Sequence, residues 1–454
     1  MREFRTLFGL AAAAALLAGS AQAAPAKSAP WTVRREQVAA EARFLASDAL
    51  QGRGSATRDE AIAAAYVASQ FESLGLTPAP GQAGFFQTAK VIKPRLQGEA
   101  KVRIDGVEVA GAQLLIGPMG DVGGKAVVFA ADDVMTMPAA DVVISTSKAS
   151  PLVVGQTAMS KQVKLLILKE SFLTKGLYAA QGGTDMASYL EGQPQGVRTA
   201  VATLPAEAFE RLAAHPGASV ELKLPPMTQE TATTTNVIGY LKGRDPKAGT
   251  LLISAHLDHL GVRPNGTIMH GANDDASGVV AVIELARAFT GGKPPKRSIL
   301  FIGYGSEEIG KYGSTWFAAH PAVPLADIVA NIEFEMIGQQ DPKLPKGALF
   351  LTGSERSTLW AALKAHGAPV TADSDPAQHY FERSDNWPLA QAGVVAHTIA
   401  GWTTTPTYHQ ASDTFESLDL PFMTGAIQSM VAPLRWLADS DFRPVWAAGG
   451  RPPP

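Results

Sequence analysis

Five short clusters in the C-terminal half of the chain contain the side chains best suited to chemistry. Three of them directly follow apolar runs, and these are His256-Leu257-Asp258-His259, Glu307-Glu308 and Glu333-Phe334-Glu335. The other two lie in loop-like sequence, and these are Asn273-Asp274-Asp275 and Tyr408-His409. The chain has no cysteine, which excludes thiol nucleophiles, disulfides and thiolate metal sites. Any metal ion must therefore be bound by histidine and carboxylate.

His256 and Asp258 stand two residues apart at the end of an apolar run that predicts a strand, so their side chains point to the same face. His256 is then available to bind a metal ion, while Asp258 accepts a hydrogen bond from the other ring nitrogen and fixes the tautomer. Two divalent ions about 3.5–4 Å apart need a bridging carboxylate, terminal ligands and room for a water. The residues that can complete such a set are Asp274, Glu308, Glu335 and His409.

The adjacent acids Glu307 and Glu308 indicate a division of labour. One carboxylate binds metal, and the other stays free beside a metal-bound water as a general base that passes a proton to the departing amine. Zinc suits this chemistry because it lowers the pKa of its bound water to about 7. Taken singly, each cluster has an ordinary explanation: a solvated loop, a surface pair, or acids at a helix N-terminus for Asp274 and Asp275. Their occurrence together favours the metal site.

The elements that must position these clusters alternate between strands and helices from Thr235 onward. Apolar runs predict strands at 250–255, 297–303, 328–335, 348–352 and 394–399, and helical patterns lie at 277–289, 314–320 and 357–366. Such alternation predicts an α/β fold, with a doubly wound, mainly parallel sheet flanked by helices. Ligands bind at the carboxyl ends of the strands in sheets of this kind, where three of the clusters lie.

Two further regions precede this part of the chain. Residues 31–87 have helical spacing of apolar side chains, including an amphipathic helix over 61–76. From about Val91 to Pro226, short β-like runs alternate with Gly, Pro and Asp, which predicts a separate β-rich domain. The predicted boundaries are a leader at 1–23, an N-terminal part of the main domain at 31–90, an insert at 91–226, the main domain at 227–446 and an unordered Gly/Pro-rich tail at 447–454.

The leader has the features of a secretory signal peptide. Arg2 and Arg5 precede an apolar run at 7–18 and the small-residue triplet Ala21-Gln22-Ala23, and cleavage is expected after Ala23. The run is shorter than the ~20 apolar residues of a membrane-spanning helix. The 454 residues include 39 Lys+Arg and 42 Asp+Glu, for a net charge of −3, a balance that argues against a nucleic-acid partner. We therefore expect a periplasmic or secreted protein without membrane contact after cleavage.

In their order along the chain, the clusters resemble the co-catalytic dizinc exopeptidases, the superfamily of bacterial secreted aminopeptidases, glutamate carboxypeptidase II and the transferrin receptor. The matching motifs are His-x-Asp at 256–258, Gly-x-Asn-Asp-x-x-Ser-Gly at 271–278, Glu-Glu at 307–308, acid-Met-Ile-Gly at 335–338 and Tyr-His-x-x-x-Asp-Thr at 408–414. Upstream, the segments at 45–54 and 71–76 look like the family's N-terminal part, which implies a discontinuous catalytic domain. The insert resembles a protease-associated domain more weakly, mainly over 197–224.

The resemblance implies two zinc ions per chain and a ligand set for each. His256 and Glu335 would be the terminal ligands of one zinc. Glu308 and His409 would be those of the other, with Asp274 as the bridge between the two ions.

The resemblance also implies an activity. It is that of an aminopeptidase that removes N-terminal residues from peptides through a metal-bridging hydroxide. Glu307 would be the general base, and Asp258 the acid that supports the first histidine. Tyr408 would donate a hydrogen bond to the developing oxyanion.

Two positions depart from the family pattern. The family usually has Asp before Met-Ile-Gly, where this chain has Glu335, and Glu333 on the same strand face is a second candidate ligand. Asn386 stands where a His is frequent. Arg383, close by, is a candidate either for contact with the substrate or for a structural salt bridge.

Several alternatives remain open at this point. A carboxypeptidase or dipeptidase of the same fold would read the substrate's terminal carboxylate through Arg383. A catalytically inactive binding protein, like the transferrin receptor, is another reading, which the complete ligand set and a free Glu307 disfavour. An acyl transferase resembling glutaminyl cyclase would lack the first histidine, whereas His256 is present.

No ligand role is expected for the remaining histidines. His259 is expected either to support the site or to face solvent, and His270 is expected to flank the site. No site role is predicted for His215, His320, His366, His379 and His397.

Overall fold

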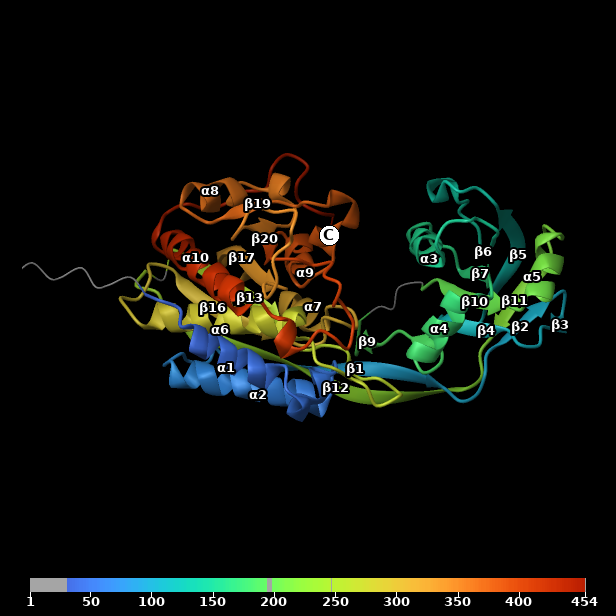
Figure 1. The fold of residues 1–454 in the computed structure, drawn as a ribbon, viewed down its shortest axis with the longest axis horizontal. Coiled ribbons are helices and arrows are strands. Elements are labelled where there is room, and N and C mark those ends of the chain that lie inside the picture. Colours follow the sequence, from blue (N-terminus) through green and yellow to red (C-terminus); the bar gives the residue numbers. More distant parts are fainter. Residues whose placement is uncertain (1–30, 194–197, 246, 454) are drawn as a thin grey trace, which may run out of the picture. The chain divides into compact units, whose positions relative to one another are not determined.

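The computed structural model describes residues 31–193, 198–245 and 247–453 (Figure 1). The predicted signal peptide at 1–23 lies outside the described residues. Within these ranges, no helix combines the length and the apolar character needed to cross a membrane.

A nine-stranded sheet carries the strands that precede the clusters, in the order β19-β18-β20-β17-β13-β16-β12-β1-β9. Its four central strands are parallel to one another, and these are β20 (Ala396–Ala400), β17 (Ile328–Glu335), β13 (Thr250–His256) and β16 (Ser298–Tyr304). The outer strands are β18 (Leu349–Leu351), β19 (Val370–Ala372), β12 (Met227–Leu241), β1 (Phe86–Leu96) and β9 (Tyr189–Leu190). The pairs that join the outer strands to the centre are antiparallel. The predicted α/β class is confirmed, with the parallel arrangement strongest at the centre of a mixed sheet.

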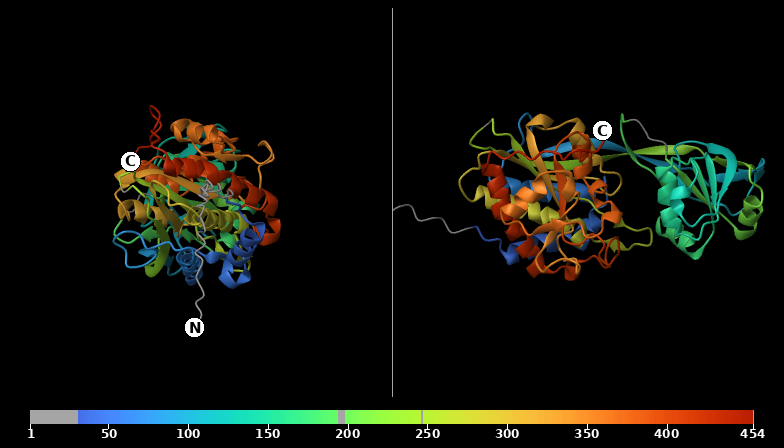
Figure 2. Two further views of the ribbon diagram at one scale, coloured as in Figure 1. Left: turned by 90° about the vertical axis from the view of Figure 1, so that its left-hand side faces the viewer. Right: turned by 90° about the horizontal axis from the view of Figure 1, so that it is seen from above.

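Helices cover both faces of this sheet, as Figures 1 and 2 show from three directions. Phe301 of β16 contacts Phe71 and Phe289 on one face. Its neighbours in the strand, Leu300 and Ile302, pack in a cluster with Phe317 on the other face. Successive strand residues point to opposite faces. The helices on the Phe301 face are α1 (Arg35–Leu45), α2 (Arg58–Ser73), α6 (Ser277–Thr290) and α10 (Leu420–Asp439), and those on the other face are α7 (Tyr312–Ala319) and α9 (Asn386–Gln391).

The central strands are mainly apolar, and both of their faces are covered. Every residue of β13 and of β16 is buried, which is the usual condition of strands in a parallel sheet with helices on both sides. A continuous apolar run, rather than alternation, is therefore the pattern that predicts them. The short helix α8 (Leu359–Ala365) packs against α10 and β19.

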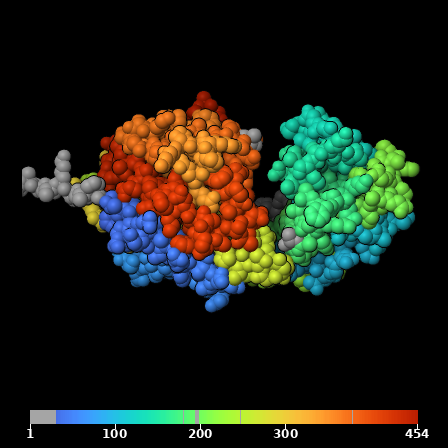
Figure 3. Space-filling model, viewed as in Figure 1, coloured from blue at the N-terminus to red at the C-terminus, as the bar shows by residue number. Residues whose placement is uncertain are grey.

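Helix α10 is the main element absent from the sequence-based prediction. It contains Pro433, and proline within a helix removes a backbone hydrogen bond and argues against a helical assignment. The apolar side chains Ile427, Met430 and Leu434 are nevertheless fully buried, so tertiary packing offsets that cost. α10 contacts α1 near the start of the described chain, and Figure 3 shows the two colours, red and blue, side by side at the surface.

Apart from β9, which belongs to the main sheet, the strands between β1 and β12 form a second nine-stranded sheet, in the order β3-β2-β11-β5-β6-β7-β10-β4-β8. Its strands are β2 (Lys101–Ile104), β3 (Val107–Glu108), β4 (Gln113–Gly117), β5 (Val122–Phe129), β6 (Val142–Ser145), β7 (Leu165–Lys169), β8 (Asp185–Met186), β10 (Ala200–Leu204) and β11 (Ser219–Lys223). Two clusters of buried apolar side chains give this part cores of its own. Its likeness to a protease-associated domain stays a prediction.

This part also holds three helices that the sequence patterns did not predict. They are α3 (Pro151–Ser160), α4 (Phe172–Ala180) and α5 (Ala206–Ala213). The sequence of α3 begins Pro-Leu-Val-Val and contains no charged residue. Periodicity alone does not separate such a short apolar run from a strand.

β1 and β12 are paired along the whole length of β1. Phe86 lies opposite Val237 at one end, and Leu96 lies opposite Met227 at the other. The backbone N–H of Gln97 then donates to the carbonyl oxygen of Pro226 at 2.8 Å. The chain therefore leaves the main sheet and returns to it at neighbouring positions, as the blue and yellow-green strands of Figure 2 show.

The tail differs from the prediction of an unordered segment at 447–454, of which residues 447–453 are described. The backbone N–H of Ala447 donates to the carbonyl oxygen of Arg356 at 2.7 Å, and Arg356 Nη1 donates to the carbonyl oxygen of Gly450 at 3.3 Å. A Cβ atom at Gly450 would lie 2.1 Å from the carbonyl oxygen of Arg356. The glycine that indicated disorder is thus what allows the tail to pack closely.

Candidate functional site

Three of the sequence clusters lie at one edge of the parallel centre of the main sheet. His256 is the last residue of β13 and Glu335 the last residue of β17, while Glu307 and Glu308 follow β16 after a short turn. Because these three strands are parallel neighbours, their carboxyl ends meet. The clusters are brought together as their positions at the ends of apolar runs predict.

The fourth cluster is the irregular turn that leads into α6. It begins at Gly271, whose φ of 60° is a left-handed conformation that glycine adopts without strain. The carboxylate of Asp413 accepts hydrogen bonds from the backbone N–H groups of Asn273 at 2.9 Å and Asp274 at 3.1 Å. The late loop that contains Asp413 therefore holds the position of Asp274.

Asp275 has a different task from that of Asp274. Its carboxylate accepts hydrogen bonds from the backbone N–H groups of Gly278 at 2.9 Å, Met336 at 3.0 Å and His256 at 3.3 Å. These groups belong to α6, to the residue after β17 and to the end of β13. Asp275 thus ties three elements of the site together, a role that the sequence did not indicate.

Asp274 lies between two groups of metal-ligand atoms. Its Oδ1 is 3.2 Å from His256 Nε2, and its Oδ2 is 3.3 Å from His409 Nε2. Glu308 Oε2 is 3.2 Å from the same nitrogen of His409. Among the described residues, two sets with ligand atoms within 4.8 Å of one another share Asp274, and they add His256 and Glu335 in one set and His259 and Glu308 in the other. The arrangement suits two adjacent cations with one common carboxylate.

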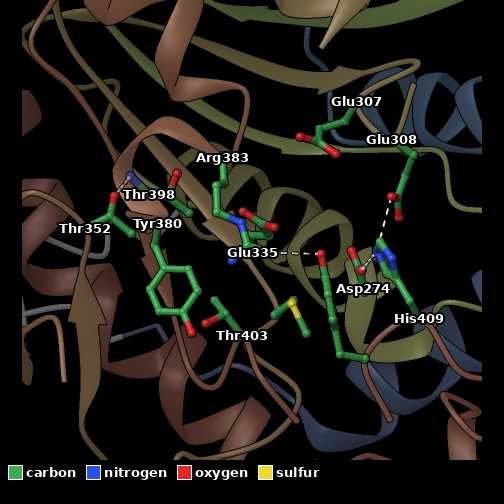
Figure 4. A pocket seen from close by; sticks show the side chains of 12 residues that line it. Asp274, Glu307, Glu308, Glu335, Thr352, Tyr380, Arg383, Thr398, Thr403 and His409 are labelled. Carbon is green, nitrogen blue, oxygen red and sulfur yellow. Dashed lines mark hydrogen bonds and ion pairs between the residues drawn. The ribbon is translucent and has the colours of Figure 1, made fainter. Parts of the chain in front are cut away.

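Glu307 and Glu308 diverge from adjacent backbone positions, as Figure 4 shows. Glu308 turns toward His409, whereas Glu307 belongs to neither set. Their backbone N–H groups donate to Oδ1 and Oδ2 of Asp258 at 2.9 and 3.2 Å. Asp258 therefore fixes the turn from which the two glutamates separate.

The two glutamates also differ in their electrostatics. Burial raises the pKa of Glu307 well above its ordinary value, and the effect of the His256 ring in the opposite direction does not cancel it. Burial acts on Glu308 too, but hydrogen bonds to His259 and His409 outweigh it and lower the pKa of Glu308 to about 2. Glu308 is thus held as an anion, while Glu307 is the carboxyl of the pair that takes up a proton more readily.

Asp258 lies beside His256, but the hydrogen bond to the ring differs from the expected one. His256 Nδ1 is 3.2 Å from the backbone carbonyl oxygen of Asp258 and 3.8 Å from its carboxylate Oδ1. The Asp258 carboxylate accepts a hydrogen bond from Ser55 Oγ at 2.5 Å, besides those from the glutamate turn. A carbonyl oxygen fixes the tautomer of a ligating histidine as a carboxylate does, so Asp258 supports the ring through its main chain.

Tyr408 and Arg383 lie at the pocket that Asp274, the two glutamates and Glu335 line. Arg383 Nη2 donates to Tyr408 Oη at 3.2 Å, and the Tyr408 ring stacks on that of His409 with centroids 3.9 Å apart. Burial raises the pKa of Tyr408 above its ordinary value, so the hydroxyl keeps its proton at neutral pH. Within the described part of the chain Arg383 forms no salt bridge, and its guanidinium lines the pocket.

Two residues that raised questions in the sequence have structural neighbours. Glu333 is buried two residues before Glu335, with Oε2 3.4 Å from Thr398 Oγ1, and it belongs to neither ligand set. The side chain of Asn386 donates to the carbonyl oxygen of Phe381 and accepts from Thr398 Oγ1, both at 3.0 Å. Asn386 therefore connects the start of α9 to β20.

His259 is the residue near the site that sequence reasoning left undecided. It is fully buried, and its Nδ1 lies 2.7 Å from Glu308 Oε1. His270 contacts Asp48 at 2.7 Å, and His397 is buried in the core between Ser357 and Thr352. The remaining histidines are exposed, namely His215, His320, His366 and His379.

Residues 236–433 match the family model described as Peptidase family M28. Over 204 residues the chain is 28% identical to Aminopeptidase YwaD of Bacillus subtilis, a match that covers 43% of this chain and 43% of that protein. Over 185 residues it is 29% identical to a vacuolar membrane protease of Lachancea thermotolerans, which covers 40% of this chain and 18% of that protein. The chain thus matches less than half the length of either relative.

Two solved structures resemble the described fold over nearly their whole length. An aminopeptidase from Aneurinibacillus sp. strain AM-1 has a TM-score of 0.60 at 19% identity, covering 90% of this chain and 94% of that chain. BSAP, a zinc aminopeptidase from Bacillus subtilis, has a TM-score of 0.56 at 20% identity, covering 92% of this chain and 98% of that chain. At these identities the likeness is one of fold.

Proposed function

We propose that this chain, of which residues 236–433 match Peptidase family M28, is an exported aminopeptidase that removes N-terminal residues from peptides. The observation that carries the proposal is the pair of ligand sets that share Asp274, with Glu307 beside them and outside both. The resemblance to aminopeptidases of Bacillus subtilis and Aneurinibacillus supports it. The charged and apolar pattern of the leader supports export to the periplasm or the medium.

The donor atoms of the two sets fit zinc. His256 Nε2 is buried, has no hydrogen-bond partner among the described residues and lies 3.2 Å from a carboxylate oxygen. An unpartnered ring nitrogen of this kind costs free energy unless a cation completes its surroundings. Imidazole nitrogen together with carboxylate oxygen is a donor set that zinc accepts. When bound, zinc would supply Lewis acidity to the pocket.

We assign the ligands as the family resemblance implies. His256 and Glu335 would hold one zinc ion, Glu308 and His409 the second, and Asp274 both. The separations of 3.2–3.3 Å from Asp274 to His256 and His409 support this assignment. Two zinc ions per chain follow from it.

Glu307 is proposed as the proton carrier. Peptide hydrolysis adds water to the carbonyl carbon and breaks the C–N bond, so a proton must pass from the water to the departing amine nitrogen. Glu307 lines the pocket without belonging to a ligand set, and its backbone is held by the hydrogen bond to Asp258. Its carboxylate is thus free to accept that proton and release it again.

Tyr408 is proposed to stabilise the negative charge that develops on the substrate's carbonyl oxygen. Its hydroxyl oxygen accepts a hydrogen bond from Arg383, which leaves its own O–H free to donate. Stacking on His409 fixes the direction of the ring. A donor held in place before the reaction costs no reorganisation at the transition state.

The charge of the pocket supports recognition of a free α-ammonium group. Before Arg383 is counted, the five carboxylates near the metal positions, Asp258 included, exceed the charge of two divalent ions by one, and such a site attracts an ammonium at short range. The guanidinium of Arg383 on the same pocket favours the alternative, a carboxypeptidase or dipeptidase that reads a terminal carboxylate.

Blocking one terminus of a substrate at a time tests the proposed polarity. We expect acetylation of the N-terminus of a good peptide substrate to abolish cleavage, because the ammonium group is lost, and amidation of the C-terminus to have little effect. Rates for the free, acetylated and amidated peptides give the comparison. Fast cleavage of the acetylated peptide and refusal of the amidated one would establish the carboxypeptidase alternative. A protein that binds both metal ions but cleaves none of the three would support a binding role.

We expect Glu335→Asp to keep both metal ions and most activity, because it restores the residue that the family usually has. The matched control is Glu333→Gln on the same strand, which should leave the metal content unchanged, since Glu333 belongs to neither ligand set. Metal analysis of both purified variants is the measurement. Loss of metal in Glu333→Gln, with full retention in a Glu335→Gln variant, would transfer the ligand role to Glu333.

A further inference from the structure

His259 is a buried histidine beside the proposed metal site. By distance it belongs to one set with Asp274 and Glu308, but the ligand assignment above gives that place to His409 and leaves His259 without a role. Its side chain is fully buried, and its Nδ1 lies 2.7 Å from Glu308 Oε1 and 3.9 Å from Asp274 Oδ2. Its Nε2 has no hydrogen-bond partner among the described residues. The ring is therefore committed to Glu308 through Nδ1.

The two oxygens of the Glu308 carboxylate face different partners at different distances. Oε2 is 3.2 Å from His409 Nε2, and the Asp274 Oδ2 atom is 3.3 Å from the same nitrogen. Ligand atoms about 2.0–2.1 Å from a tetrahedral ion lie roughly 3.3–3.4 Å from one another. The distance of 2.7 Å from Oε1 to His259 is shorter than this and falls at the length of a charge-assisted N–H···O hydrogen bond, about 2.7–2.9 Å. Oε2 thus belongs with the ligand atoms, and Oε1 with a hydrogen bond.

We propose that His259 is a positioning residue, whose Nδ1–H donates to Glu308 Oε1 and so holds Oε2 toward the second metal position. This inference rests on the proposed function, because it assumes that Glu308 is a metal ligand. An outer hydrogen bond of this kind orients a ligating carboxylate and limits its rotation. Without it, Glu308 would have to be ordered by the metal ion alone.

The surroundings of His259 hold its ring in the required place. Its backbone N–H donates to the carbonyl oxygen of Arg53 at 3.0 Å. The ring packs directly on Gly271, where a Cβ atom would lie 2.5 Å from His259 Cγ. Only glycine leaves room for the ring at that point, and its left-handed φ of 60° suits glycine as well.

Arg53 connects both supports of the ring. Its fully buried guanidinium donates to the carbonyl oxygens of Leu257 at 2.8 Å, His270 at 2.7 Å and Gly271 at 2.8 Å. It therefore joins the segment that carries His259 to the turn on which the ring rests. Arg53 of the Gly-Arg-Gly motif at 52–54 thus holds the two segments that position the ring of His259.

Three replacements of His259 separate a hydrogen-bond donor from a metal ligand. The amide nitrogen of His259→Asn is attached to Cγ, as Nδ1 is, and keeps a donor at that place. His259→Gln puts its amide one bond further out, and His259→Phe fills the volume without a donor. The readouts are the affinity of each Zn²⁺ site, by competition with a chelator, and the visible absorption of the Co²⁺-substituted protein.

We expect the Phe and Gln variants to bind the second Zn²⁺ about 10- to 100-fold more weakly than wild type, the usual cost of losing such a contact. We expect the Asn variant to bind it within a few-fold of wild type and to keep the Co²⁺ spectrum. Thermal unfolding of the metal-free proteins shows which variants fold. Should the Phe variant not fold, the comparison of Asn with Gln decides.

Two results would overturn the inference. A second-site affinity that falls as far in the Asn variant as in the other two, with an altered Co²⁺ spectrum, would make His259 a direct ligand. Unchanged affinity in every folded variant would show that Glu308 needs no support from it. A wild-type protein that binds fewer than two metal ions would instead contradict the proposed function, and the inference would fall with it.

Discussion

Replacing Glu307 by Gln is expected to remove most turnover while both metal ions stay bound. The change removes the carboxylate proposed to carry the proton, but no member of the two ligand sets. General acid–base catalysis contributes about 10²–10⁴-fold to a rate, so kcat should fall by a factor in that range. The measurement is kcat on an unblocked peptide, with metal analysis of the same preparation.

The matched control for this prediction is Glu333→Gln, which neutralises another buried carboxyl of the same sheet edge. It should leave kcat within a few-fold of wild type, because Glu333 does not line the pocket. If the Glu307→Gln protein turned over within a few-fold of wild type, Glu307 would not be the base. If it lost metal, Glu307 would be a ligand rather than a proton carrier.

Replacing Asp274 by Asn is expected to lower the metal content of the protein and its activity together. Asp274 is the residue common to both ligand sets, so its neutral amide would weaken two sites at once. Burial acts to raise the pKa of this carboxyl, but the adjacent rings of His256 and His409 outweigh it and hold the pKa well below its ordinary value. The native side chain is therefore an anion, and the substitution removes a full charge.

Metal content per chain, measured after gel filtration in metal-free buffer, provides the check on Asp274→Asn. Glu307→Gln serves as its control, since it removes one carboxylate from the same pocket and should keep both ions. Two tightly bound ions in the Asp274→Asn protein would show that Asp274 is not the bridging ligand. Thermal unfolding of the metal-free variant separates loss of metal from loss of fold.

The sequence predicted the sheet well where its strands are buried on both faces. The run Ile328–Glu335 forms β17 as expected, and β13 and β16 begin and end within one residue of the expected bounds. The positions of the clusters directly after predicted strands also located the site, because the carboxyl ends of neighbouring parallel strands meet at the same end of the sheet. The order of the apolar runs and the acids that follow them are sufficient to locate the site.

What the sequence did not predict depends on the direction of individual side chains and on tertiary packing. A carboxylate two residues after His256 was expected to bind its ring, yet the path of the main chain gives that place to the carbonyl oxygen of Asp258. The roles of Asp275 and Asp413 lie in bonds to backbone N–H groups distant in sequence. No helix was predicted at α10, which contains Pro433; tertiary packing stabilises this helix although proline disfavours it locally.

The long pair formed by β1 and β12 has a consequence for how the chain reaches its fold. An entire unit, residues 97–226, stands where an ordinary hairpin has a short turn. Closing a flexible loop costs entropy that grows slowly, by about 0.6 kcal/mol for each doubling of its length. Within the unit β2 pairs with β11, with Lys101 opposite Lys223, so its own folding brings its two ends together. If this unit folds first, β1 and β12 are already close together. The entropy cost of pairing them in the catalytic sheet is then smaller.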